Sequence, residues 1–138
     1  MKITTGKSRR ERRRRRGAVA LEFVLLTGVL LLLIVGTVEL GRAIMVRQVL
    51  VNAAREGARR AVVPGATDAE VVEIVNNYMT HSGIAGQTIQ ISPALSAAAS
   101  HQAVTVRVSV LHSQVSWGFT NLISGNAAFV AEVVMRKE

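Results

Sequence analysis

The feature that most constrains this chain is the junction near residue 17, where a strongly basic stretch meets an almost uncharged apolar segment. Nine Lys or Arg residues lie among the first sixteen. The segment from Ala18 to Leu40 that follows is long enough, at about 1.5 Å per residue, to cross a hydrocarbon core of about 30 Å. We therefore predict a single-pass membrane helix over residues 18–40. Because Lys and Arg favour the cytoplasmic side, residues 1–17 form a cytoplasmic leader and the C-terminal part is extracytoplasmic.

The net charge of the chain belongs to this leader. The first sixteen residues carry nine bases against one acid, Glu11, which accounts for the whole formal charge of +8. From Gly17 onward, eight bases balance eight acids. An Arg run can bind nucleic acid, but here it abuts an apolar span and no base-reading surface accompanies it. We therefore predict a lipid bilayer, and no nucleic acid, as a partner.

The apolar segment is longer than the core of a secretory signal peptide, which has 7 to 15 apolar residues and then a small-residue cleavage site. After Leu40 the helical pattern continues without turn residues. We therefore expect the segment to be retained in the mature protein.

Few side chains in this sequence could support catalysis. The chain has no Cys, which excludes disulfides and Cys-based zinc sites. His81, His101 and His112 are isolated from one another and from clustered acids, and the stretch from Gly83 to Gly86 is a turn rather than a phosphate-binding loop. We predict no catalytic, cofactor-binding or metal site, and hence a protein that is not an enzyme.

Glu22 is the one charged residue early in the apolar segment. An acid at the centre of a membrane helix costs about 2.5 to 3.5 kcal/mol, and less near an end, so an intramembrane Glu is a functional hypothesis by default. Alternatively, Glu22 lies among the cytoplasmic headgroups, where Arg15 or Arg16 neutralises it. The bilayer argument by itself leaves both interpretations open.

Three blocks of sequence carry a resemblance to known families. The stretch from Arg16 to Phe23 resembles the processing site of type IV prepilins, with a basic leader, Gly17, and Glu22 at the fifth position of the mature chain. The blocks 38–42 and 52–59 resemble the TadE-like pseudopilins of the tight-adherence (Flp pilus) secretion systems. The family motif residues are Glu39, Gly41, Arg42, Asn52, Arg55, Glu56, Gly57 and Arg59.

This resemblance implies a minor pilin-like protein that takes part in assembly of a tight-adherence pilus. A prepilin peptidase would cut between Gly17 and Ala18, where Gly offers no Cβ to obstruct the protease. Glu22, with Phe23 beside it, would then act in assembly, Glu22 pairing with the amino terminus of a neighbouring subunit. The implied partners are the peptidase, other pilin-like subunits and the tight-adherence membrane machinery. The alternative is an uncleaved single-span envelope protein with an extracytoplasmic binding domain.

Residues 41–63 continue the helix with a different pattern, because apolar residues now occupy one side only. Glu56 and Arg60 stand at a spacing that favours an ion pair. Small residues form a low ridge that lets another helix or a sheet approach closely, although the same residues also simply favour a helix. The ridge consists of Ala53, Ala54, Gly57, Ala58 and Ala61.

Beyond Pro64 and Gly65, which end the long helix, we predict a small α+β domain over residues 66–138. Thr67 and Glu70 form a capping box that starts a second helix extending to Ser82. Alternating or β-branched runs at 88–92, 104–111 and 129–135 predict a small antiparallel sheet of about three strands. Residues 92–102 are a connection, and 115–124, which contain Trp117, are a short helix or a loop.

Overall fold

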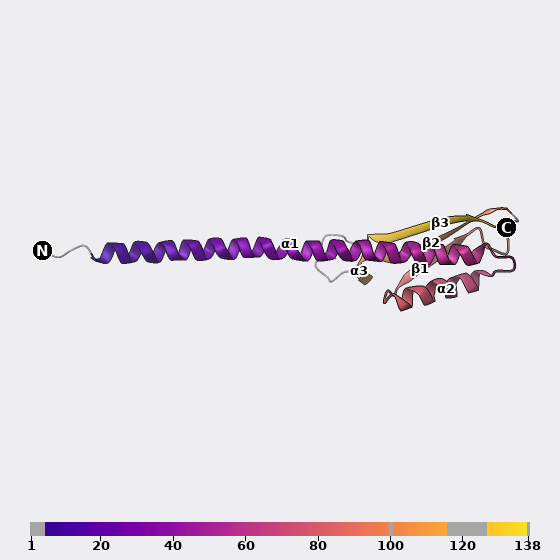
Figure 1. Cartoon of the computed structure of the whole chain (residues 1–138), viewed down its shortest axis with the longest axis horizontal. Coiled ribbons are helices and arrows are strands. Elements are labelled where there is room, and N and C mark those ends of the chain that lie inside the picture. The colour runs from indigo at the N-terminus through magenta and orange to yellow at the C-terminus, as the bar shows by residue number, and fades with distance from the viewer. Residues whose placement is uncertain (1–4, 100, 116–126, 138) are drawn as a thin grey trace. The chain divides into compact units, whose positions relative to one another are not determined.

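The computed structural model describes residues 5–99, 101–115 and 127–137. Along the chain, helices α1 (Thr5–Ala61) and α2 (Asp68–His81) precede strands β1 (Gln87–Ser92) and β2 (Ala103–Leu111), and a one-turn helix α3 (His112–Val115) leads toward β3 (Ala128–Arg136) (Figure 1). The predicted α+β class, with two main helices and three strands, is confirmed. The predicted segment 115–124 lies, apart from Val115, outside the described residues.

The chain divides into two compact units, Met1–Val38 and Glu39–Glu138. In the first unit the side chains from Gly17 onward are almost all exposed, because no other element packs on them. Two hydroxyls in this stretch bond to their own helix, since Thr27 Oγ1 donates to the carbonyl of Phe23 and Thr37 Oγ1 to that of Leu33, both at 2.8 Å. Apart from Glu22, the polar side chains between Ala18 and Val38 are therefore satisfied without water.

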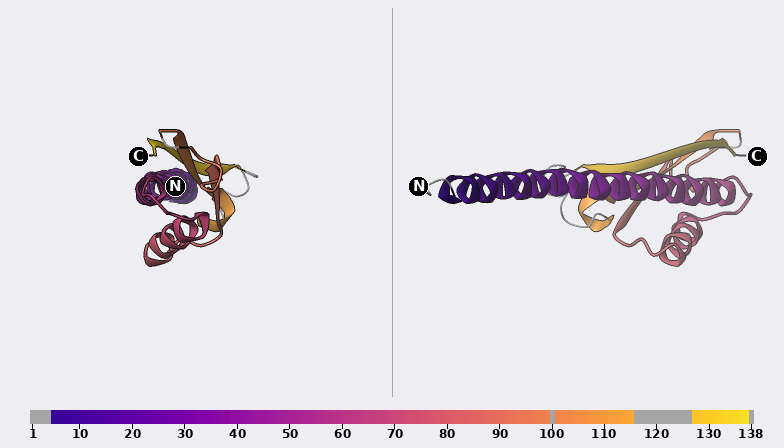
Figure 2. Two further views of the ribbon diagram at one scale, coloured as in Figure 1. Left: turned by 90° about the vertical axis from the view of Figure 1, so that its right-hand side faces the viewer. Right: turned by 60° about the vertical axis from the view of Figure 1, so that its left-hand side comes forward.

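The second unit is built on an antiparallel sheet with the strand order β1-β2-β3. Strand β2 lies in the middle, with its pairing to β1 running from Gln87↔Val110 to Ser92↔Thr105 and its pairing to β3 from Ala103↔Arg136 to Leu111↔Ala128. Alternate residues of β2 are buried, and α1 and α2 lie against that face of the sheet (Figure 2). The buried members of β2 are Val104, Val106, Val108 and Val110.

The small-residue ridge of α1 lies at the centre of this core. Its four alanines are fully buried. A Cβ added to Gly57 would lie 2.6 Å from Cγ2 of Val75 on α2 and 3.3 Å from Cγ1 of Val106 on β2. The predicted close approach to the ridge is therefore confirmed at Gly57, where both a helix, α2, and the sheet contact α1.

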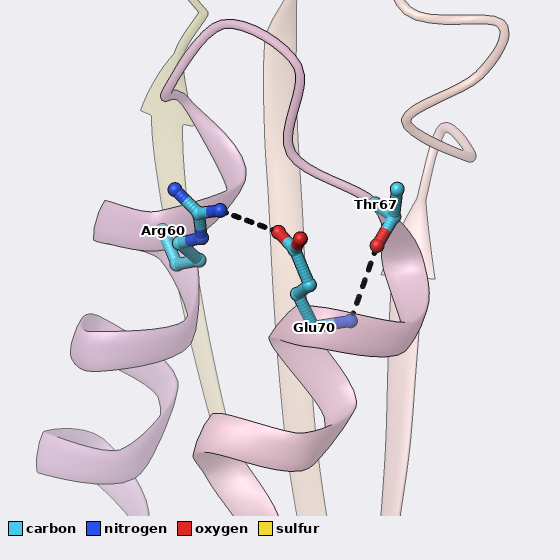
Figure 3. Close-up of polar contacts among 3 residues, drawn as sticks. All are labelled: Arg60, Thr67 and Glu70. Carbon is cyan, nitrogen blue, oxygen red and sulfur yellow. Dashed lines mark hydrogen bonds and ion pairs between the residues drawn. The ribbon is translucent and has the colours of Figure 1, made fainter.

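The entry into α2 differs in part from the predicted capping box (Figure 3). Thr67 caps the helix as expected, because its Oγ1 accepts the backbone N–H of Glu70 at 3.3 Å. The Glu70 carboxylate, however, accepts from Arg60 at 2.5 Å rather than turning back to Thr67. The predicted pair between Glu56 and Arg60 is wrong for the same reason, since Glu56 binds Arg59 at 2.8 Å and leaves Arg60 to bridge α1 and α2.

The connection between β1 and β2 is held to the rest of the unit by hydrogen bonds. Leu95 is buried, and its backbone N–H donates to the Asp68 carboxylate at 3.0 Å. The Lys137 ammonium donates to the carbonyl oxygens of Leu95 and Ala98, both at 3.2 Å. These contacts tie the connection to the start of α2 and to the residue after β3.

The close approach at Gly57 generates a first prediction. Gly57→Ala places a methyl group against Val75, a stiff β-branched side chain. Overpacking costs about 1–3 kcal/mol, while Ala is favoured over Gly within a helix by about 1 kcal/mol, so we expect a net loss of up to about 2 kcal/mol in the free energy of unfolding. Thermal or urea unfolding of the full chain in detergent micelles measures it.

The matched control is Gly41→Ala, because a Cβ at Gly41 would meet nothing within 4 Å. This variant keeps the gain in helix propensity without the clash, so it should be as stable as the parent or more stable by up to about 1 kcal/mol. Equal stability of the two variants would contradict the tight contact at Gly57.

Candidate processing and assembly site

The predicted processing residues lie in consecutive turns of α1. Gly17 and Ala18 are helical, and a Cβ at Gly17 would meet nothing within 4 Å. The carbonyl of a helical residue accepts a hydrogen bond from the residue four positions later, so cutting the bond after Gly17 requires local unwinding. Glycine favours that unwinding, because it costs about 1 kcal/mol relative to Ala in a helix interior.

The predicted assembly residues are adjacent to this bond and exposed. Glu22 stands four residues after Ala18, which puts both on one side of the helix. Phe23 is 70% exposed and joins a continuous set of exposed apolar side chains rather than any core. A new chain start at Ala18 would place an ammonium group one turn from the Glu22 carboxylate. A carboxylate in the first turns also interacts favourably with the helix dipole.

The family motif residues do not form one site, because the structure divides them among four surroundings. Gly57 is in the core, as described above. Glu56 and Arg59 form an ion pair on the exposed surface of α1. Gly41 is exposed on the same helix.

Glu39 and Arg42 lie at the start of the second unit, where with Ala43 and Val46 they line a small pocket. The opposite wall is formed by residues from the far part of the sequence, namely His112, Val115 and Phe129. The His112 ring contacts the Phe129 ring, with centroids 5.3 Å apart, and Glu39, Arg42 and His112 all have interaction partners. The pocket therefore joins the motif to the end of the sheet.

Asn52 and Arg55 are exposed on α1, where they line a shallow open groove. They share this groove with Ile44, Arg47, Gln48 and Val51. Sequence reasoning missed the groove and the pocket alike. The groove residues lie three or four positions apart along one helix, so their spacing in the sequence could have predicted the groove. No local sequence signal predicts that His112 lies near Glu39.

Chemical groups for catalysis are not gathered in the described part of the chain. No set of three or more His, Asp or Glu side chains there is placed to hold a metal ion, and no buried charged side chain occurs among the described residues.

The helix from Gly17 to Ala61 is long and apolar enough to cross a membrane. Residues 17–59 match the family model described as TadE-like protein. The chain is TadE-like over this segment. The match starts at Gly17 and contains Glu22, Phe23 and every motif residue, so the resemblance inferred from the sequence is confirmed. No match was found among curated proteins or solved structures.

Proposed function

We propose that this TadE-like chain is a minor pilin-like subunit that takes part in assembly of a tight-adherence pilus, and that a prepilin peptidase removes residues 1–17. In this proposal the apolar helix anchors the protein in the cell membrane with its leader in the cytoplasm, and the folded unit lies outside. The subunit acts by assembly with other pilin-like subunits and with the membrane machinery of the system, and performs no catalysis.

The observation that carries the proposal is the exposed apolar surface of α1 within the TadE-like segment. Fifteen large apolar side chains between Val19 and Leu40 are exposed, with Glu22 the only charge in the first unit after Gly17 and before Glu39. Leaving such a side chain in water forgoes about 1.5–3 kcal/mol each, so this surface requires a lipid or protein environment. The helix forms hydrogen bonds within itself for its backbone and for its two Thr hydroxyls, so it is compatible with either a lipid or a protein environment.

Charge supports the processing step. Cleavage after Gly17 would remove the +8 leader and leave a chain from Ala18 that is neutral by count, with an additional amino-terminal charge. A basic leader holds the N-terminus at the cytoplasmic surface and opposes movement of the helix out of the membrane. Its removal would lower that barrier, and Glu22 would be left with an amino terminus as its natural partner.

The first test of the proposal is maturation of the full chain in its native host. The intact mass and N-terminal sequence of the membrane-extracted protein should show a chain that starts at Ala18. Gly17→Val should block this maturation, because a branched side chain obstructs approach to the bond and no protein neighbour of Gly17 is disturbed.

Gly28→Val serves as the control, since Gly28 lies in the same helix and a Cβ there also meets nothing within 4 Å. It should mature normally. If the parent chain keeps its leader in a host with an active prepilin peptidase, the processed-subunit proposal fails and the uncleaved envelope protein replaces it.

The second test separates assembly from anchoring at Glu22. Glu22→Ala makes the apolar segment more apolar, so membrane retention and cleavage should be unchanged. Co-purification with other pilin-like subunits should fall strongly, because the amino terminus of a neighbour loses its carboxylate partner. The control Thr27→Ala removes a hydroxyl that bonds only to its own helix and should co-purify normally. Normal co-purification of Glu22→Ala would refute the assembly role.

A further inference from the structure

The groove on α1 carries a positive charge that the folded unit does not balance. It contains Arg47 and Arg55, which are both exposed. The helix has no acid between Glu39 and Glu56. Glu56 is already paired with Arg59, and no described residue forms an ion pair with Arg47 or Arg55. The groove therefore presents two cationic side chains and no anionic one.

Apolar side chains lie between and beside these charges. Ile44 is 53% exposed, and Val51, which stands between the two arginines in sequence, is half-buried. The exposed amides of Gln48 and Asn52 complete the lining. From Ile44 to Arg55 the groove follows the helix for about 16 Å. Apolar and cationic side chains thus alternate along its length.

The shape of the groove suits a helix. The residues that line it all belong to α1, so it offers no strand edge with which an extended segment could form main-chain hydrogen bonds. Side chains three and four positions apart form the ridges and grooves into which a second helix packs. An amphipathic helix can therefore lie along this surface with its apolar face on Ile44 and Val51.

The charge of the groove decides what kind of helix it accepts. A second copy of the chain placed groove to groove would bring Arg against Arg in either direction of the helices, because the groove holds no acid. Like charges brought together across an interface oppose binding. Carboxylates are the complement, since a guanidinium group can donate two parallel hydrogen bonds to one carboxylate.

We propose that this groove binds an acidic amphipathic helix of another subunit. Arg47 and Arg55 are eight residues apart, which corresponds to about 12 Å along the helix axis. A partner helix meets both when it carries two Asp or Glu residues seven or eight positions apart, with an apolar residue between them that contacts Val51. This inference deepens the assembly role in the proposed function and rests on it for the presence of a partner subunit, but it does not require removal of the leader.

The test is site-specific photo-crosslinking of the full chain in its native host. Benzoylphenylalanine is introduced in place of Gln48, which lines the groove, or in place of Asn77, a matched exposed amide on α2. Mass spectrometry identifies the cross-linked peptide. Position 48 should cross-link to a helix of another subunit that carries two acids at the predicted spacing, and position 77 should not cross-link to that helix.

Charge reversal tests the proposed recognition directly. Arg47→Glu combined with Arg55→Glu should lower the cross-linking yield at position 48 at least about fivefold, because two attractive pairs become repulsive. Replacing the two acids of the partner by Arg should restore the yield. The control is Arg136→Glu, since Arg136 is also exposed and forms no ion pair with any described residue, but lies at the end of β3. It should leave the yield unchanged, and circular dichroism verifies the fold of each variant.

Cross-links from position 48 to lipid, to a second copy of the chain or to a segment without the two acids would overturn the inference. An equal loss of yield in Arg136→Glu would also overturn it. If pilin-like subunits co-purify but position 48 forms no cross-link, the groove inference fails while the proposed function stands. If the expected cross-link forms in a chain whose intact mass shows a retained leader, the proposed processing fails while the groove inference stands.

Discussion

The close packing of α1 against α2 and β2 at Gly57 is the contact on which the folded unit depends. The helix contributes mainly alanines there and the sheet contributes valines, so the core is filled by bringing backbones together rather than by large side chains. No buried polar or charged side chain interrupts this core among the described residues. The distances of α2 and of the sheet from α1 therefore both depend on how closely α1 can be approached.

One helix serves two environments because the distribution of its side chains changes near residue 39. Before that residue its large apolar side chains are exposed on every side, whereas from Val46 onward one side is buried by protein and the other carries Arg, Asn and Gln. The boundary between the two compact units lies at the same place. The folded unit therefore begins where the apolar segment ends, with no linker residues between them.

The proposed processing and assembly residues differ physically from the rest of the TadE-like segment. Gly17, Ala18, Glu22 and Phe23 have no packing role in the chain alone, so their chemistry is available to a peptidase or to another subunit. Gly57, in contrast, is required by the fold. A motif defined by sequence likeness thus combines residues that hold the unit together with residues whose partners lie outside it.

The sequence by itself determined the type and order of the elements, since hydrophobic period, a capping Thr and turn residues are local signals. It also indicated the ridge, the apolar segment and the TadE-like resemblance. The tertiary structure alone decided which charges pair. Arg60 forms its ion pair with Glu70 and not with Glu56, which is nearer in sequence. Asp68 and Lys137 form hydrogen bonds with the backbone of Leu95 in the connection after β1. It alone brought His112 and Phe129 to Glu39 and Arg42. The physical reason is that such contacts act over a few ångströms, so they depend on which distant segments the core brings together.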